Sequence, residues 1–217
     1  MTKEQLNVVG QSVPRRDGMG HVKGETLYVH DRQFPGMLHL KMVRSPVPHA
    51  RIKSIDFSEA EKVPGFVRAL THEDVPKNVY TILCLIGVGP DEEPVLAEDK
   101  VMYVDQPIAA VIAETEAAAM EAVSKVKLDL EELPAVFDPR DAIKEGATII
   151  HEGVANNTSF DIRKEFGDVE KAFAESDLVS EDTFYSQPVN HAPMEPHAAV
   201  AQYDQLTGQV TVWARTQ

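Results

Sequence analysis

The clearest structural pattern in this sequence is Pro107-Ile-Ala-Ala-Val-Ile-Ala-Glu-Thr-Glu-Ala-Ala-Ala-Met-Glu-Ala-Val-Ser-Lys-Val-Lys-Leu-Asp-Leu-Glu131. Residues 107–113 are apolar on both faces of an extended chain, which predicts a central, buried strand. Thr115 is a good N-cap for the helix that follows. Four apolar residues share one face of that helix: Ala119, Ala122, Val123 and Val126. Residues 127–131 alternate between polar and apolar side chains and predict a second strand. The stretch therefore predicts a small βαβ unit.

The residues before this stretch predict further strands. Met37–Arg44 alternates as a strand does. Arg51–Phe57 also predicts a strand, but Ile52 and Ile55 break strict alternation, which indicates a β-bulge. Other short strands are predicted at Thr26–Val29, Phe66–Leu70 and Val101–Val104, and a capped turn at Thr71–Pro76. A helix is predicted at Glu59–Val63, where Ser58 and Glu61 complete a capping box, and another at Asp168–Ala174, with Asp168 at its start. The loop-rich stretch Lys77–Lys100 is interpreted as a contact with another subunit.

A rigid polar turn organises the last part of the chain: Gln187-Pro-Val-Asn-His-Ala-Pro-Met-Glu-Pro-His-Ala-Ala-Val-Ala201. Its prolines restrict the backbone, and such a turn is costly unless a partner or ligand uses it. Strands are predicted on both sides of it, at Leu178–Gln187 and Ala198–Tyr203. A hairpin turn at Asp204–Gly208 then leads to a strand at Gln209–Trp213, and together these predict one antiparallel set.

Composition limits the possible functions. The 217 residues are 43% hydrophobic and carry a formal net charge of −14, which argues against a nucleic-acid partner. Cys84 is the only cysteine, so the chain has no internal disulfide, iron–sulfur cluster or Cys-type zinc site of its own. Its apolar neighbours predict a small buried side chain. The N-terminus lacks a secretory signal, and no apolar run approaches the ~20 residues of a membrane span. We therefore expect a soluble cytoplasmic protein.

The polar turn contains the strongest candidate site residues. His191, Glu195 and His197 stand at positions i, i+4 and i+6, a possible metal-ligand set. Helical geometry would bring His191 and Glu195 to one face, but Pro193 and Pro196 forbid that helix. Glu195 is either a desolvated acid–base group or a carboxylate that accepts backbone N–H bonds and pins the turn, and we favour the second interpretation. We predict no metal site in this chain.

Three weaker motifs complete the search. Ser45 with His49, and Ser186 with His191, are the nearest serine–histidine pairs, but neither lies in the glycine pattern of a nucleophile elbow. The basic pair and glycines of Arg15–Gly20 are interpreted as a surface loop rather than a phosphate-binding loop, since no strand precedes them and no convincing helix follows. The residues alone therefore predict an acidic α+β protein without a complete catalytic constellation.

Four ordered stretches resemble one family. They are Val43–Ile52, Leu96–Val111, Leu133–Pro139 and His191–Pro196. Together they are similar to the start of the molybdopterin-binding large subunit of the xanthine dehydrogenase/aldehyde oxidase family, the molybdenum hydroxylases. The resemblance implies an extended lead-in over 1–17, an α/β-hammerhead domain over 18–135, and the first, incomplete segment of the molybdenum-binding domain over 136–217. Family members usually carry glycine where this chain has Asp105, which raises the question whether this backbone position needs a positive φ.

The resemblance also implies a chemistry. In the family, the large subunit carries a molybdenum–molybdopterin cofactor and hydroxylates an aldehyde or N-heterocycle with oxygen from water. Electrons leave through [2Fe-2S] clusters to FAD on partner domains or subunits. The family strand that ends in Thr-Gln matches Val212–Gln217, so Gln217 is implied to lie beside the molybdenum, where its amide could hydrogen-bond a metal-bound oxygen. The turn residues Gln187, His191, Met194, Glu195 and Pro196 are interpreted as a structural signature that braces these strands.

The family's glycine-rich loop, most pterin contacts and the glutamate base lie beyond these residues. We therefore expect a truncated or split large subunit that is inactive alone and binds no cofactor alone. Its expected partners are the rest of the large subunit and the FAD and iron–sulfur subunits, in an oligomer without nucleic acid or membrane contact. Two alternatives remain open: a non-catalytic hammerhead scaffold or interaction module, and a small metal-binding protein that uses His191, Glu195 and His197.

Overall fold

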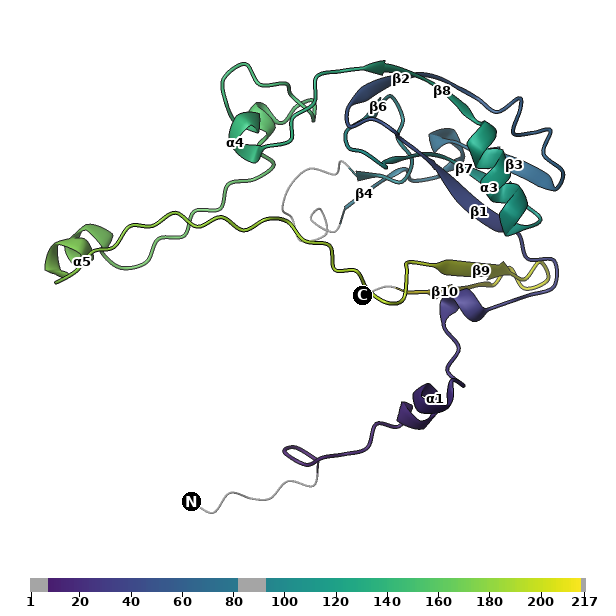
Figure 1. Ribbon diagram of the computed structural model, residues 1–217, viewed down its shortest axis with the longest axis horizontal. Coiled ribbons are helices and arrows are strands. Elements are labelled where there is room, and N and C mark those ends of the chain that lie inside the picture. Colours follow the sequence, from purple (N-terminus) through teal and green to yellow (C-terminus); the bar gives the residue numbers. More distant parts are fainter. Residues whose placement is uncertain (1–7, 82–92, 216–217) are drawn as a thin grey trace. The chain divides into compact units, whose positions relative to one another are not determined.

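The computed structural model describes residues 8–81 and 93–215, so Cys84 and Gln217 lie outside the described residues (Figure 1). The chain divides into two units. One, the central unit, is Gly36–Val179. The other, the terminal unit, combines Met1–Pro35 with Ser180–Gln217. These divisions fall at other positions than the predicted domain boundaries, so the predicted division into 1–17, 18–135 and 136–217 remains a prediction.

The first sheet of the central unit has β7 (Pro107–Ala113) at its centre, between β1 (His39–Arg44) and β3 (Phe66–Leu70). Both neighbours run antiparallel to β7. Five of the seven β7 residues are buried, in agreement with the prediction of a central strand. A strand that is apolar on both faces can be covered on both faces only in the interior, and this requirement makes β7 the middle of the sheet.

The second sheet joins β2 (Ala50–Asp56) to β6 (Lys100–Val101) on one side and to β8 (Lys127–Glu132) on the other, again antiparallel. The predicted β-bulge is present, because the register of β2 shifts between Ile52 and Ser54. The predicted βαβ unit is wrong in its pairing, since β7 and β8 belong to different sheets. The alternation of β8 is the physical reason: a strand with one solvated face suits an antiparallel sheet, whereas parallel βαβ strands are buried on both faces.

Helix α3 (Glu116–Lys125) connects the two sheets and covers β1 and β7 (Figure 1). The Thr115 side chain caps it by accepting the Ala118 N–H at 3.1 Å, as predicted. Ala119 and Ala122 are the fully buried positions of its apolar face. The main core joins residues of both sheets and the helix: Val43, Ala60, Val63, Ala109, Val111 and Ala122, with Ile55 and Leu128 packed against them.

The remaining elements of the described residues are short. They are α1 (Gly18–Lys23), η1 (Val29–Asp31), η2 (His72–Asp74), α4 (Pro139–Ala142), η3 (Ala155–Asn157), α5 (Val169–Glu175), and the paired strands β4 (Val79–Tyr80) and β5 (Glu93–Pro94). The predicted helix that starts at Asp168 is α5, and the Asp168 side chain caps it by accepting the Lys171 N–H. The capped turn predicted at Thr71–Pro76 is η2. No helix of the described residues is long and apolar enough to cross a membrane.

Five local predictions are wrong. Of the strand predicted at Val101–Val104, only Val101 belongs to a strand, β6. The segment Glu59–Val63 forms hydrogen-bonded turns rather than a helix, because Pro64 and Gly65 follow too closely for a second helical turn. Thr26–Val29 forms no strand and instead enters η1. Leu178–Gln187 is exposed and pairs with no strand among the described residues. A helix does follow the basic pair at Arg15, since α1 begins at Gly18.

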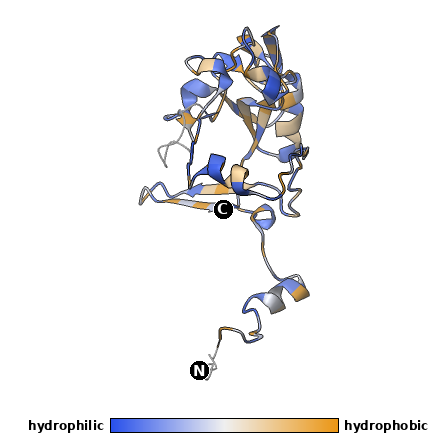
Figure 2. Cartoon of the chain, turned by 90° about the vertical axis from the view of Figure 1, so that its left-hand side faces the viewer, coloured by the Kyte–Doolittle hydropathy of each residue, from blue (hydrophilic) through white to orange (hydrophobic). Residues whose placement is uncertain are grey.

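The terminal unit contains a β-hairpin formed by β9 (Ala199–Tyr203) and β10 (Val210–Ala214). The predicted turn between these strands is confirmed. Asp204 Oδ1 accepts the Leu206 N–H at 2.9 Å, and this hydrogen bond lowers the pKa of the Asp204 carboxyl. The N-terminal η1 lies against β9. Both strands of the hairpin contain apolar residues along their length (Figure 2).

Candidate functional site

The polar turn is held by its own side chains and contains one strained residue. Asn190 Oδ1 accepts the Ala192 N–H at 2.8 Å and forms a local turn. Ala192 has a φ of 42°, in the left-handed region, although it has a Cβ and precedes Pro193. Such strain persists only where neighbouring structure imposes it, and it is concentrated at functional sites. The turn at Asn190–Pro193 is therefore a candidate functional feature.

Glu195 links this turn to the strand that leaves the hairpin. Its Oε2 lies 3.3 Å from Arg215 Nε, and the two side chains are 29% and 32% exposed. The Arg215 N–H also donates to the Ala198 carbonyl at 3.2 Å, which extends the hairpin pairing beyond Ala214. We expected Glu195 to accept backbone N–H bonds; among the described residues its recorded partner is the Arg215 side chain instead. The Glu195–Arg215 ion pair therefore connects the polar turn to the strand end of the hairpin.

The candidate metal ligands do not form a metal centre. His191 and His197 are exposed, whereas Glu195 is turned towards Arg215. Within residues 8–81 and 93–215, no group of three or more His, Cys, Asp or Glu residues has metal-binding geometry. The hypothesis of a small metal-binding protein therefore has no geometric support at this turn.

Trp213 is the aromatic centre of the terminal unit, and sequence reasoning missed it. The Phe34 ring stacks on the indole at a centroid distance of 5.1 Å and an interplanar angle of 30°. The Arg32 guanidinium carbon lies 5.0 Å from the indole centroid, a cation–π distance. Arg32 and Phe34 lie far from Trp213 in sequence, so no local pattern predicts the contact. The one hint in the sequence is that a basic and an aromatic side chain stand two residues apart, just before Gly36.

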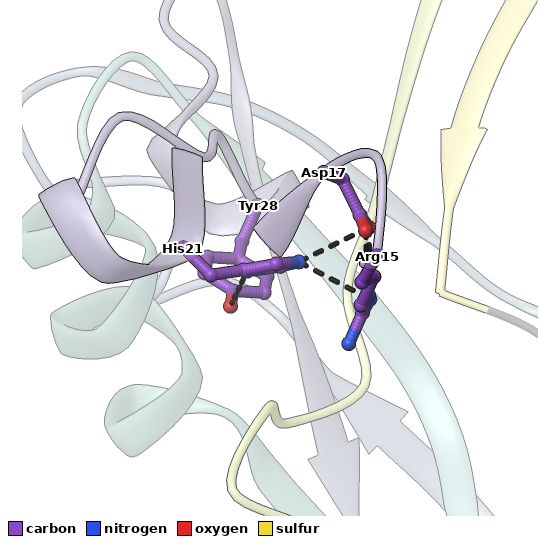
Figure 3. A network of polar contacts seen from close by, with 4 residues as sticks. All are labelled: Arg15, Asp17, His21 and Tyr28. Atoms are coloured by element: carbon purple, nitrogen blue, oxygen red, sulfur yellow. Dashed lines mark hydrogen bonds and ion pairs between the residues drawn. The ribbon is translucent and has the colours of Figure 1, made fainter. Parts of the chain in front are cut away.

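A polar network holds the N-terminal segment (Figure 3). Arg15 donates two hydrogen bonds to the Asp17 carboxylate, at 2.5 and 2.8 Å, and these lower the pKa of Asp17 to about 2. His21 Nε2 lies 3.2 Å from Asp17 and 3.2 Å from Arg15. Its Nδ1 lies 3.3 Å from the Tyr28 hydroxyl. The guanidinium of Arg15 is thus engaged within the chain, which fits a structural loop rather than a phosphate site.

The two serine–histidine pairs are not nucleophile–base pairs in this structure. The buried Ser45 donates to the Val47 carbonyl at 2.7 Å. The buried His49 donates from Nδ1 to the Pro134 carbonyl at 2.6 Å, because a carbonyl can only accept. No hydrogen bond joins Ser186 to His191 among the described residues, and both side chains are exposed.

The question at Asp105 has a positive answer. Asp105 has a φ of 66°, so this position does require a left-handed backbone. Its N–H donates to the Ser45 carbonyl at 2.9 Å, and its own carbonyl accepts from Arg44 Nη1 at 2.8 Å. These bonds tie the end of β1 to the loop before β7, which explains why the strained conformation is kept.

The described residues therefore present a braced strand end rather than a reaction centre. The Glu195–Arg215 ion pair and the Trp213 cluster hold β10 and the residue after it, and the strained residue Ala192 lies shortly before Glu195 in the chain. Gln217, the residue that the resemblance implies at the molybdenum, lies outside the described residues. What the described residues can do chemically is to hold the backbone that leads to Gln217.

Comparison with known proteins identifies two family models along the chain. Residues 23–134 match the aldehyde oxidase and xanthine dehydrogenase a/b hammerhead domain. Residues 150–217 match the molybdopterin cofactor-binding domain. The two matches occupy separate, consecutive segments.

Individual relatives agree with these matches. One component of the probable xanthine dehydrogenase of Bacillus subtilis is 38% identical over 205 residues, which is 94% of this chain and 26% of that protein. The gamma subunit of the 6-hydroxypseudooxynicotine dehydrogenase complex of Paenarthrobacter nicotinovorans is 35% identical, with the same two coverages. The crystal structure of the aldehyde oxidoreductase from Desulfovibrio desulfuricans has a TM-score of 0.86 and 35% identity, and the alignment covers 95% of this chain and 24% of that one.

The chain spans about a quarter of the length of these curated relatives. Its mixed strand and helix content, with two antiparallel sheets and α3 packed on the β1-β7-β3 sheet, is an α+β hammerhead fold. Since the hammerhead model alone matches more than half of the residues, the chain belongs to the aldehyde oxidase and xanthine dehydrogenase a/b hammerhead family.

Proposed function

We propose that this chain contributes the hammerhead domain and the first molybdopterin-binding segment to the large subunit of a molybdenum hydroxylase of the xanthine dehydrogenase/aldehyde oxidase type. The observation that carries the proposal is the consecutive match of both family models along one chain. The domain division proposed is a lead-in over 1–17, the hammerhead over 18–135 and the molybdopterin-binding segment over 136–217. A cytoplasmic location and an oligomeric assembly are part of the same proposal.

In the completed enzyme, the molybdenum–molybdopterin group supplies the oxidation of an aldehyde or N-heterocycle with oxygen from water. This chain's residues position one side chain for that chemistry. Gln217 would lie beside this group, where its side-chain amide would donate a hydrogen bond to it. Glu195 orients the strand before Gln217 through its ion pair with Arg215. Electrons would pass to [2Fe-2S] clusters and FAD on partner domains or subunits.

The exposed apolar side chains of residues 160–194 support a larger assembly. Phe166, Phe184 and Met194 are 98%, 90% and 102% exposed, and other large apolar residues of the same segment are also exposed. Large apolar side chains that are this exposed favour burial against a partner. The rest of the large subunit is the partner that this proposal assigns to the segment.

The test is reconstitution. The chain is co-expressed with the remaining large-subunit segment and the FAD and iron–sulfur subunits, and molybdenum content and oxidation of a panel of aldehydes and N-heterocycles are measured. We expect metal and activity in the assembled complex and neither in the isolated chain. Gln217→Ala should lower kcat, whereas Gln205→Ala, in the exposed hairpin turn, should not. A complex that holds molybdenum but oxidises nothing in the panel would contradict the enzymatic proposal and favour the scaffold alternative.

A further inference from the structure

One face of the β9–β10 hairpin is covered by the N-terminal segment of the same unit. Along β10, Thr211 and Trp213 are partly buried, whereas Val210 and Val212 are 61% and 58% exposed. This alternation shows that only one face of the strand has a cover. The cover comes from the residues before Gly36, because η1 contacts β9 and the Arg32–Phe34 stretch contacts Trp213.

Two side chains, two residues apart, converge on the same indole. Arg32 has extended backbone angles, φ −77° and ψ 124°. In an extended chain, side chains at i and i+2 point to the same side, so Arg32 and Phe34 can both reach one ring. Phe34 contributes an aromatic stack at 5.1 Å, and Arg32 a cation–π contact at 5.0 Å. The contact therefore has two chemically different parts that can be removed separately.

The segment that carries these side chains is itself ordered by polar contacts. Asp31 Oδ2 accepts the Tyr28 N–H at 2.9 Å, and the Asp31 N–H donates to the Tyr28 carbonyl at 3.1 Å. The Tyr28 hydroxyl reaches His21, which joins the Arg15–Asp17 pair (Figure 3). The position of Arg32 and Phe34 is thus fixed by the hydrogen-bonded segment before them.

We propose that residues 15–34 form a strap that positions β10, with Arg32 and Phe34 as positioning residues acting through Trp213. The strap fixes the covered face of the hairpin, and the Glu195–Arg215 ion pair fixes the backbone just after β10. Without the strap, a two-stranded hairpin is only marginally stable in water. The consequence for catalysis rests on the proposed function, since it concerns the strand that leads to Gln217.

The first experiment needs no activity. Trp213 is the only tryptophan in the chain, so its fluorescence reports on this contact alone. In the full chain, Arg32→Met and Phe34→Leu should each shift the Trp213 emission to longer wavelength. Amide hydrogen exchange over residues 210–215 should accelerate by about threefold for each variant and by about tenfold for both together. Arg32→Lys and Phe34→Tyr, which keep the cation and the ring, should restore slow exchange.

Matched controls separate this effect from general loosening. Outside the strap, Lys171→Met removes a cation on α5 that forms an exposed ion pair with Glu175, and Phe173→Leu removes an exposed ring on the same helix. Both should leave the Trp213 emission and the exchange of 210–215 unchanged. Exchange over β7 should also stay constant in every variant. The proposal is overturned if the double variant leaves emission and exchange at 210–215 unchanged, or if β7 accelerates equally.

The second experiment uses the reconstituted enzyme. Arg32→Met/Phe34→Leu should lower kcat by about tenfold while molybdenum content and KM stay near those of the parent, because misplacing a reacting group by a fraction of an ångström costs rate rather than binding. Unchanged kcat in the double variant would overturn the positioning role. If the unmodified complex itself oxidises nothing, the proposed function fails, whereas the fluorescence and exchange results still decide the strap.

Discussion

At the residue scale, the sequence predicted side chains that act locally and missed those that act across the fold. Thr115 caps α3 as predicted, because an N-cap bond spans only three residues. The helix predicted to start at Asp168 is also present, and the Asp168 side chain caps it. The partner of Glu195 was not predictable, since Arg215 reaches it only through the register of the β9–β10 hairpin. Gln217 stays a prediction of the resemblance.

Asp105 offers a direct test of backbone strain. Because its φ is 66°, Asp105→Gly should stabilise the central unit by about 0.5–1 kcal/mol, and Asp105→Ala, which lacks a polar side chain that tolerates this region, should destabilise it by a similar amount. The measurement is urea unfolding followed by circular dichroism. Equal midpoints for the glycine and alanine variants would show that this conformation carries no strain.

The Glu195–Arg215 ion pair should couple the turn to the strand end. A double-mutant cycle with Glu195→Gln and Arg215→Met should give a coupling free energy of about 0.5–1 kcal/mol, since both side chains are about one-third exposed and solvent screens part of the attraction. Urea unfolding monitored by Trp213 fluorescence measures it. The matched control is the same cycle with Lys171→Met and Glu175→Gln, an exposed ion pair on α5. Its coupling free energy should be smaller, because solvent screens this pair more strongly. Additive effects at Glu195 and Arg215 would contradict the brace.

At the element scale, the spacing of apolar residues predicted strands and helices correctly where the element is long enough to show a clear period. β7 and α3 were predicted with nearly their observed bounds, because a fully apolar strand and a capped amphipathic helix leave little choice. Short elements were less predictable. The segment Glu59–Val63 has a capping-box pattern but ends at Pro64 before a helix can propagate, and helix nucleation is costly. The exposed segment 178–187 has strand-like composition but no strand to pair with among the described residues.

The network around α1 should depend on pH. The pKa of Asp17 is lowered from 3.8 to about 2, first by its hydrogen bonds from Arg15. A lowered folded-state pKa means that the carboxylate stabilises the network fully above its unfolded pKa near 3.8, and that this contribution is lost as pH falls through about 2. Carboxyl-detected NMR should find the Asp17 titration near pH 2, and Arg15→Met should move it upward. An unchanged Asp17 titration in Arg15→Met would refute the assigned cause.

At the scale of the whole molecule, the pattern of strands and helices predicted the α+β class, and the resemblance of four ordered stretches implied the hammerhead family. Neither predicted the pairing of strands within the sheets. The predicted βαβ unit assumed that β7 and β8 share a sheet, but each pairs antiparallel with strands from earlier in the chain. Pairing between distant segments depends on which faces meet in the core, where Leu128 of β8 packs against the cluster that contains Val111 of β7. Similarly, no local pattern indicated that Met1–Pro35 groups with Ser180–Gln217.

That grouping leads to a prediction about unfolding. The central unit has its own buried core, whereas the terminal unit has a single hairpin covered on one face, so the two units should unfold in two transitions rather than one. Ile108→Ala, at a fully buried position of β7, should destabilise the central unit by about 2–5 kcal/mol. Circular dichroism should then show an earlier urea midpoint, while the Trp213 fluorescence midpoint stays where it was. Val210→Ala, at an exposed position of β10, is the control that should move neither midpoint by much. If both probes shift together in Ile108→Ala, the two units unfold as one cooperative body, and the strap would then share its stability with the hammerhead.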